Sequence, residues 1–416
     1  MRVSRRAEEL KESTTLAITE RAKGMRRAGA DVLAFAAGEP DFDTPECIKL
    51  AAIEALRAGL TKYAPIPGDE ETRHTIARKL ATENGIPDIT GDHVVISTGA
   101  KHSIYLAMQC LIDQPRADDS PHEVLIPVPA WLSYAPVAQL AGARVVEIPT
   151  TASSGFRMTP EQLDRALSPR SRLLVLNSPC NPCGTMYRPD DLRALASVIL
   201  RAARERCPDL CILSDEIYER IVYGPDPHFS IGSIPAIAER VITINGMSKA
   251  FAMTGWRIGY LAGSGSFGLV LAEAVAKLQG QMTSNITSFL YPAIRAALRD
   301  GAADSARMCA AFALRASLIH ERLGRIPGLR TVRPVGAFYA FPDVSSCFGM
   351  VSPRGKLLAN ADDFAAALLD EHAVAAIPGT DFGGCGSNHM RFSFACSESQ
   401  IERGMDRLGE FVSSLR

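Results

Sequence analysis

One lysine, Lys249, lies in a run of small and apolar residues, NGMSKAFAMTGWRIGY at 245–260, and Arg257 follows it eight positions later. Burying an unpaired ammonium is so costly that a buried lysine tends to lose its proton instead. The neutral amine that results is a nucleophile and a base. Because most lysines are exposed, an ordinary surface lysine is the alternative interpretation of this stretch taken alone.

Three further stretches place polar or flexible residues where an apolar run ends. VVISTGAKHS ends a predicted strand at Gly99 and Ala100 and opens a helix, whose free N–H groups and dipole favour an anion. NSPCNPCG carries Asn181 in a rigid loop, and CILSDEIYE ends an apolar run at Asp215 with Tyr218 three residues later. A carboxylate at the end of a buried strand needs a partner, which could be an arginine or a protonated ring nitrogen.

Each of these stretches alone could be an ordinary turn or helix cap, and their combination is what indicates chemistry. In open α/β sheets, ligands bind beyond the carboxyl ends of the strands. Pyridoxal phosphate requires a lysine that can lose its proton, cationic and amide groups for its phosphate, and a carboxylate for its pyridinium. The sequence therefore predicts a site for this cofactor.

Short apolar runs alternate with helical patterns between residues 92 and 262, and these elements must position the site. Seven runs are predicted as strands: HVVIST, EVLIPVP, ARVVEIP, RLLVLNSP, LCILSDE, RVITING and RIGYLAG. Such continuous apolar runs are typical of a mostly parallel sheet between helices, which makes the chain an α/β protein. In DTPECIKLAAIEALRAG, Thr44 is the predicted N-cap, Pro45 the first helical residue and Gly59 the stop. MTPEQLDRALSP repeats the pattern.

After about residue 290 the pattern changes to long helices, a few strands such as GAFYAFPDV and HMRFSFA, and a last helix opened by SESQ. Residues 1–45 also lie outside the alternating region, and their charged amphipathic helix is predicted to return to this second block. We therefore predict a large domain at 46–290 and a smaller α+β domain formed by residues 1–45 and 291–416.

The composition narrows the class of partner. With 45 Lys+Arg against 46 Asp+Glu the formal net charge is −1, without a long run of one sign, so neither nucleic acid nor a membrane surface is an expected partner. The chain shows no stretch of transmembrane length and no signal-peptide pattern. Ten irregularly spaced cysteines indicate reduced thiols and a cytoplasmic location.

These motifs resemble those of the class I aminotransferases, pyridoxal-phosphate enzymes of fold type I, and most of all the bacterial aspartate aminotransferases. The resemblance runs nearly end to end, through AAGEPDFDTPE, TKYAPIPG, NSPCNPCG, SDEIYE, SKAFAMTGWRIGY, PGTDFG and RFSFA. It implies a homodimer with shared active sites. It also implies transamination between an L-amino acid, expected to be aspartate or another dicarboxylic donor, and a 2-oxo acid such as 2-oxoglutarate.

The resemblance also implies roles for the residues around the cofactor ring. Lys249 would form the Schiff base with pyridoxal 5'-phosphate and shuttle the proton between the substrate and the cofactor. Asp215 would hold the ring nitrogen protonated, and Tyr218 and Asn181 would hydrogen-bond the phenolic oxygen. Trp131, in VPAWLSYAP, would stack on the ring and line the substrate site.

The same resemblance implies which residues bind the cofactor phosphate and the carboxylates of the substrate. Gly99, Ala100 and Arg257 would hold the phosphate, with Tyr63 reaching it from a neighbouring subunit. Arg391 would bind the substrate α-carboxylate as a bidentate pair, beside the backbone of Gly38 and the amide of Asn181. Lys101, one residue past the phosphate turn, would read a second carboxylate, contact the phosphate or face solvent.

The sequence departs from the family pattern at a few positions. Cys180 and Cys183 stand where the loop usually has asparagine and threonine, LQGQMTSNIT differs from aspartate-specific relatives, and Ser248 receives no role. An aminotransferase for aromatic or other amino acids, or a carbon–sulfur lyase on the same fold, therefore remains an alternative. A non-catalytic effector domain would need a DNA-binding extension, and the enzyme pattern already fills the chain.

Spacing alone suggests two other site types. Gly263, Gly265 and Gly268 have the spacing of a dinucleotide-binding loop, but the acidic ribose partner expected about 20 residues later is missing. Four cysteines could be read as a zinc site, although their places around strand ends argue against tetrahedral convergence. They are Cys180, Cys183, Cys207 and Cys211.

Overall fold

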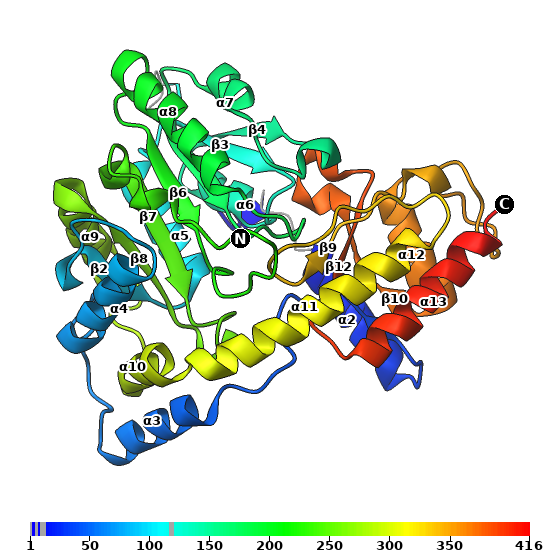
Figure 1. Cartoon of the computed structure of the whole chain (residues 1–416), viewed down its shortest axis with the longest axis horizontal. Coiled ribbons are helices and arrows are strands. Elements are labelled where there is room, and N and C mark those ends of the chain that lie inside the picture. Colours follow the sequence, from blue (N-terminus) through cyan, green and yellow to red (C-terminus); the bar gives the residue numbers. More distant parts are fainter. Residues whose placement is uncertain (1, 5–6, 9–13, 116–119) are drawn as a thin grey trace.

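The computed structural model describes residues 2–4, 7–8, 14–115 and 120–416 (Figure 1). Residues 9–13 of the predicted N-terminal helix and residues 116–119 of a polar loop lie outside the described residues. Residues 7–8 and helix α2 (Thr14–Arg27) form the described part of that N-terminal helix.

A seven-stranded sheet forms the centre of the larger part of the molecule, and all seven predicted strands contribute to it. Its order is β2-β8-β7-β6-β5-β3-β4. The strand bounds are β2 (Val94–Ser97), β3 (Glu123–Val128), β4 (Arg144–Pro149), β5 (Ser171–Asn177), β6 (Cys211–Asp215), β7 (Val241–Gly246) and β8 (Gly259–Gly263). The sheet is mostly parallel, and the predicted α/β class is confirmed.

Strand β8 is the one member of this sheet that runs against the others, because it pairs antiparallel with both β7 and β2. Its carboxyl end at Gly263 therefore lies at the edge opposite the carboxyl ends of the parallel strands. The glycine turn considered for a dinucleotide follows this reversed strand, so it lies away from the edge where α/β sheets bind ligands. The dinucleotide interpretation is not supported.

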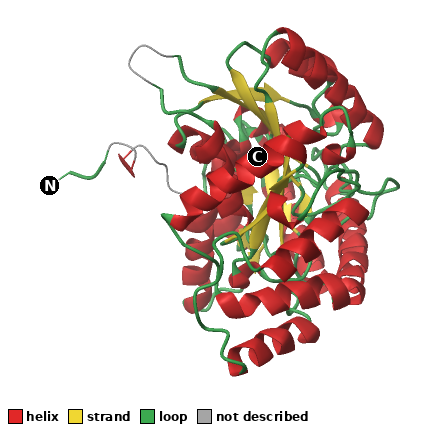
Figure 2. Ribbon diagram, turned by 90° about the vertical axis from the view of Figure 1, so that its left-hand side faces the viewer, coloured by secondary structure: helices red, strands yellow, loops and turns green. Residues whose placement is uncertain are grey.

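Helices cover both faces of this sheet, as Figures 1 and 2 show. Apolar side chains of α5 (Ala100–Leu111), α6 (Tyr134–Leu140) and α9 (Gly265–Gly280) pack on one face. Those of α7 (Pro160–Ala166) and α8 (Pro189–Glu205) pack on the other. Near β2 and β8, a third cluster joins α3 (Glu46–Arg57), α4 (Glu70–Thr82) and α10 (Tyr291–Asp300). The strands are thus buried on both sides, which explains their continuous apolar sequences.

The smaller part contains two small sheets and joins an N-terminal segment to the C-terminal block. β11 (Ile377–Pro378), β12 (Met390–Ser393) and β9 (Tyr339–Ala340) form one sheet, and β1 (Leu33–Ala34) pairs in parallel with β10 (Val374–Ala375) in the other. Helices α11 (Ala302–Gly324), α12 (Ala361–His372) and α13 (Glu398–Ser414) pack with these strands. The N-terminal segment does return to the C-terminal block, whereas the domain boundaries stay a prediction.

The sequence predicted helices α3 and α7 correctly, but it placed the start of α3 one residue too early. α7 begins as predicted, with Thr159 accepting from the Gln162 N–H. α3 has Pro45 as its N-cap rather than its first residue, so the prediction of Thr44 as N-cap is wrong. The Thr44 hydroxyl instead donates to Ala252 O at 2.8 Å, because a loop from the lysine region lies beside it.

None of the helices within the described residues combines the length and the apolar character that crossing a bilayer would require.

Candidate active site

The polar groups predicted from the sequence gather beyond the carboxyl ends of β5, β6 and β7. Asn177 at the end of β5 pairs in register with Asp215 at the end of β6, and Asp215 pairs with Ile244 of β7. The loops that follow these strands carry Asn181 and Lys249. Three adjacent strand ends therefore bring groups from widely separated sequence positions to one edge of the sheet.

Lys249 is half-buried, and charged side chains surround it. Its Nζ donates to Gly38 O at 2.5 Å and lies 5.8 Å from the centre of the Phe338 ring. Burial lowers the pKa of Lys249 to about 8, with Arg257 and Arg391 acting in the same direction and Glu39 and Asp215 opposing them. Lys249 is therefore not an ordinary surface lysine, and about a tenth of this amine is neutral at pH 7.

Asp215 is 3% exposed and has a partner that sequence reasoning missed. Tyr134 donates to its Oδ2 at 2.6 Å, and the Ile217 N–H donates to its Oδ1 at 3.2 Å. Burial raises the pKa of Asp215 to about 6, and these two hydrogen bonds act against that rise. These hydrogen bonds fix the carboxyl group, which can still accept a hydrogen bond from a cationic or N–H partner.

Arg391, on β12, is 2% exposed and reaches the same edge from the smaller part of the molecule. Its Nη2 donates to Ala36 O at 2.7 Å, and its Nη1 donates to Asn181 Oδ1 at 3.0 Å. Its guanidinium carbon lies 4.9 Å from the centre of the Tyr339 ring, and its Nε is buried without a hydrogen-bond partner. A planar cation with an unused donor is suited to a carboxylate.

Two buried tyrosines connect this arginine to the rest of the site. The phenol oxygens of Tyr218 and Tyr339 lie 2.8 Å apart, and their rings meet edge to face. A side chain at Gly38 would bring its Cβ to 2.6 Å from the Tyr339 hydroxyl, so the backbone approaches this tyrosine closely. Gly38, Tyr218 and Arg391 therefore converge as predicted, around a tyrosine that was not predicted.

A corner suited to an anion, the candidate anion-binding corner, lies at the start of α5. Gly99 caps this helix with φ +86, and a Cβ there would lie 2.3 Å from Nη2 of Arg257. Lys101, on the first turn, has its Nζ 4.9 Å from the centre of the Trp131 ring. Lys101 is exposed overall, and partial desolvation of its ammonium, followed by the nearby Arg257, lowers the pKa of Lys101. Free helix-end N–H groups, including that of Ala100, and a guanidinium provide the cradle that a phosphate needs.

Tyr63 is the predicted site residue that the single chain does not bring to the others. It lies between α3 and α4 and is 93% exposed. Its expected contribution to a neighbouring subunit stays a prediction, and its exposure leaves the side chain accessible to such a subunit.

Tyr134 and Tyr339 are the site residues that sequence reasoning missed. Tyr134 is the first residue of α6, and Tyr339 lies in the apolar strand β9. A tyrosine in such a setting most often belongs to the core, so its sequence gives no sign of its hydroxyl partner. The sequence offered one signal, which is that Tyr134 follows Trp131 by three residues. In the structure the rings of these two residues are in contact.

Among the described residues, one group of side chains has the geometry of metal ligands, and it begins at the residue after Asp215. Ligand atoms of Glu216, Glu219 and His228 lie within 4.8 Å of one another. Lys79 pairs with Glu219 there, and Asn84 donates to both glutamates, so the group forms a buried ion-pair network of its own. The four cysteines weighed for zinc do not meet that geometry, because Cys211 begins β6 whereas the loop of Cys180 and Cys183 follows the end of β5.

Comparisons with known proteins give one consistent result. The family described as aminotransferase class I and II matches residues 30–408. The aspartate aminotransferase of Geobacillus stearothermophilus is 38% identical over 100% of both chains. The bifunctional aspartate aminotransferase and glutamate/aspartate-prephenate aminotransferase of Petunia hybrida is 40% identical over all of this chain and 83% of its own. The crystal structure of the aspartate aminotransferase from Rhizobium meliloti has a TM-score of 0.92 at 37% identity, and the match covers 100% of both chains.

Proposed function

The chain belongs to the class I and II aminotransferases, which use pyridoxal phosphate on fold type I, and from that premise we propose that it transfers the amino group of L-aspartate, or another dicarboxylic amino acid, to a 2-oxo acid such as 2-oxoglutarate. The observation that carries this proposal is the convergence of a half-buried amine with a lowered pKa, a buried carboxyl group and a buried guanidinium at one edge of the sheet. They belong to Lys249, Asp215 and Arg391.

The residues present fit the cofactor. A Cβ at Gly99 would clash with Arg257, so this corner has room for an anion only while position 99 remains glycine. The carboxyl group of Asp215 has a raised pKa because it is buried without a cation at hydrogen-bond distance, and a ring N–H would supply that partner. Trp131 would lie against the ring, and Tyr218 and Asn181 would bind its phenolic oxygen.

Bound pyridoxal phosphate supplies an electron sink that makes the proton on the substrate Cα acidic. Lys249 is the base that we assign to that proton. Its pKa of about 8 leaves a working fraction of free amine at neutral pH, which suits a group that must both accept and return a proton. The Nζ also lies 2.5 Å from Gly38 O, so its position is defined before a substrate binds.

Arg391 orients the amino acid through its α-carboxylate. The guanidinium is fixed on two sides by Ala36 O and Asn181 Oδ1, and its Nε is left without a partner. A bidentate pair with a carboxylate would satisfy that donor and align the Cα–H bond with the amine of Lys249. The ring of Tyr339 packs against the same guanidinium.

The preference for a dicarboxylic donor rests on Lys101. Its ammonium stands over Trp131, beside the corner assigned to the phosphate, where a second carboxylate of the substrate could pair with it. The relatives' names favour aspartate, and the Petunia relative is also named for prephenate, so we propose prephenate as a second candidate acceptor. A preference for aromatic donors or carbon–sulfur elimination are the alternatives that product analysis separates.

We further propose that the protein acts as a homodimer with shared sites. α3 leaves Leu50, Ile53 and Leu56 exposed at a spacing of three, which is one stripe of the helix surface. The segment that follows exposes Tyr63, and monomers rarely leave a continuous apolar surface of this kind in water. A second copy that covers this surface would bring its own Tyr63 toward the candidate anion-binding corner.

The decisive experiment is a panel of amino donors and 2-oxo acid acceptors with the purified holoenzyme, read as kcat/KM and as identified products. We expect aspartate and glutamate to lead the donors, with 2-oxoglutarate, oxaloacetate or prephenate as acceptors. Preference for aromatic or neutral donors would reject the dicarboxylic assignment. Release of ammonia and pyruvate from a sulfur amino acid, without a new amino acid, would assign the protein to the lyases.

A further inference from the structure

The loop that carries Asn181 contains two thiols three positions apart, in the sequence Cys180-Asn-Pro-Cys183 between β5 and α8. Two cysteines at this spacing after a strand are typical of redox-active pairs in reducing compartments. We propose that Cys180 and Cys183 are oxidised by a peroxide to a reversible disulfide, and that this bond switches the enzyme off by moving Asn181.

The backbone of the loop holds the two cysteines on one closed turn. The Gly184 N–H donates to Cys180 O at 2.9 Å, and the Cys180 N–H donates to Thr185 O at 2.8 Å. Closed turns bring Cα atoms three residues apart to within about 7 Å, and a disulfide spans about 4.4–6.8 Å between Cα atoms. The Cys180 thiol donates to Pro129 O at 3.9 Å, and the neighbouring Cys183 thiol lowers the pKa of Cys180, so the two thiols lie close together on this turn.

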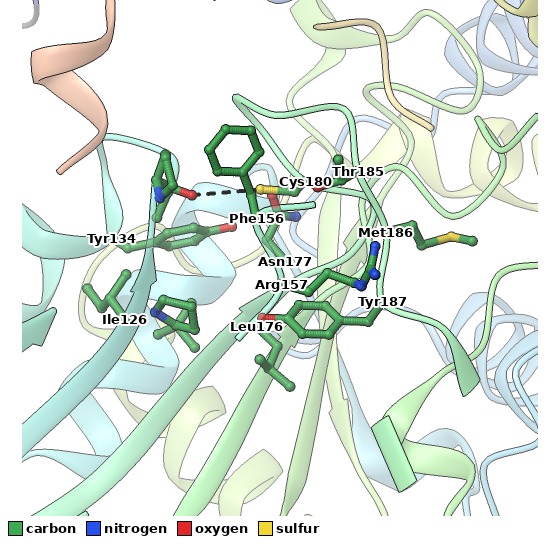
Figure 3. Close-up of a pocket in the computed structure, with 14 residues that line it drawn as sticks. Ile126, Tyr134, Phe156, Arg157, Leu176, Asn177, Cys180, Thr185, Met186 and Tyr187 are labelled. Carbon is green, nitrogen blue, oxygen red and sulfur yellow. Dashed lines mark hydrogen bonds between the residues drawn. The ribbon is translucent and has the colours of Figure 1, made fainter. Parts of the chain in front are cut away.

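The two thiols differ in access and in acidity. Cys183 is 1% exposed in an apolar cluster, whereas Cys180 is half-buried and lines a small cavity of about 20 Å³, large enough for a water molecule (Figure 3). The hydrogen bond from the Cys183 thiol lowers the pKa of Cys180, while burial raises that of Cys183. Since the thiolate is the reactive form, Cys180 is the sulfur that meets the oxidant.

The chemistry balances with hydrogen peroxide as the oxidant. The Cys180 thiolate attacks one peroxide oxygen, the O–O bond breaks, and the leaving hydroxide takes a proton to form water. Cys183 then displaces the hydroxyl group from the oxidised sulfur, which forms the S–S bond and, with the Cys183 proton, a second water molecule. Two electrons leave the thiol pair, and a dithiol reductant reverses the step by disulfide exchange.

Closing this bond affects the site because Asn181 lies between the two sulfur atoms in sequence. The sulfurs must approach to about 2.05 Å, which is far inside hydrogen-bond contact, so the turn must tighten. Asn181 Oδ1 accepts from Arg391 Nη1 at 3.0 Å, and the Asn181 N–H donates to Asn177 Oδ1 at 2.9 Å. Tightening the turn displaces this amide from Arg391 and loosens the group that orients the substrate.

The test treats the holoenzyme with hydrogen peroxide, maps its disulfides by peptide mass spectrometry, and follows kcat/KM before and after dithiothreitol. We expect one peptide linked internally at Cys180 and Cys183, and a loss of kcat/KM of up to about a hundredfold that the reductant restores. Cys180→Ser and Cys183→Ser should each resist peroxide. Cys47→Ser, which alters a half-buried thiol on α3, should respond as the wild type does.

Other results would overturn the proposal. A crosslink from either cysteine to Cys385, whose charge influences Cys183, would assign the switch to a different pair, and Cys385→Ser would then resist peroxide. Irreversible oxidation of Cys180 without a crosslink would show chemical damage instead of a reversible switch. The disulfide map does not depend on the proposed function, whereas the loss of kcat/KM does. A mapped disulfide in a protein without transaminase activity would therefore refute the function and leave the thiol pair standing.

Discussion

The phenol of Tyr134 donates a 2.6 Å hydrogen bond to Oδ2 of Asp215, and both side chains are buried. This bond favours the charged carboxylate against the effect of burial, so its removal should raise the pKa of Asp215 further. Tyr134→Phe should lower kcat/KM by about ten- to a hundredfold, the usual consequence of losing a hydrogen bond to a charged group. Steady-state kinetics check this. Tyr105→Phe, a half-buried tyrosine on α5, is the matched control and should change little.

Gly99→Ala should weaken cofactor binding. Position 99 has φ +86, where an alanine is strained by about 1–3 kcal/mol, and its Cβ would lie 2.3 Å from the Arg257 guanidinium. The dissociation constant of pyridoxal phosphate, measured from its visible absorption, should rise at least about tenfold. Gly24→Ala, a helical position with open space around it, should leave that constant unchanged. Equal effects from both variants would remove Gly99 from the phosphate cradle.

Lys249 should lower the stability of the cofactor-free protein at neutral pH. Its pKa falls from 10.5 to about 8 on folding, so the folded state binds fewer protons than the unfolded state between these values. The cost of burying the charge is therefore fully present below about pH 8 and disappears as the pH rises toward 10.5. Lys249→Met should raise the free energy of unfolding by about 2–3 kcal/mol at pH 7, with a smaller gain at pH 10.

Urea titrations of the apoprotein at both pH values measure that difference. Lys277→Met changes a lysine of α9 whose side chain is 73% exposed, and it should change the free energy of unfolding at pH 7 by less than about 1 kcal/mol. A destabilised Lys249→Met protein at pH 7 would contradict the assignment of a costly buried amine.

Lys101→Ala should discriminate between substrates. If its ammonium pairs with a distal carboxylate, kcat/KM for aspartate and glutamate should fall by the equivalent of about 2–4 kcal/mol, while alanine and phenylalanine lose little. The ratio of kcat/KM values across donors is the measurement. An equal loss for all donors would assign Lys101 to the phosphate or to the fold, since its ammonium lies near both Trp131 and Arg257.

Tyr63 should act in trans. Tyr63→Phe and Lys249→Ala homodimers should each have low activity, and mixed subunits should regain part of it because one of the two shared sites is then intact. Size-exclusion chromatography with activity assays on the mixture is the measurement. Full activity of an isolated monomer at assay concentration would refute the shared site.

The sequence predicted the elements well because their signals are local. Seven apolar runs became the seven strands, and Thr159 with Pro160 marked the start of a helix correctly. The reversal of β8 was not predictable, since a fully buried strand has the same apolar pattern in either direction. The N-cap of α3 was misplaced by one residue, because Thr44 binds Ala252 O, a partner 208 residues away.

A candidate site residue could be predicted when its residue type is rare in that sequence context. A residue whose type is common in its context could not be predicted. A lysine in an apolar loop and an aspartate at the end of a buried strand are conspicuous, and Lys249 and Asp215 indeed lie at one edge of the sheet. A tyrosine in a core position is ordinary, so the hydroxyl partners of Tyr134 and Tyr339 needed three-dimensional contacts to be seen.

The hydrogen bond from Arg391 to Ala36 O joins residues 355 positions apart, and this separation sets an order of events during synthesis. At about 5–20 residues per second, a ribosome needs about 20 to 70 s to advance from one of these residues to the other. For most of that interval the segment around Ala36 lacks its strand partner β10, and the contact with β12 can form only at its end. A nascent chain can thus complete the central sheet and its lysine loop well before any carboxylate-binding arginine exists, which makes substrate recognition the last property that the growing polypeptide acquires.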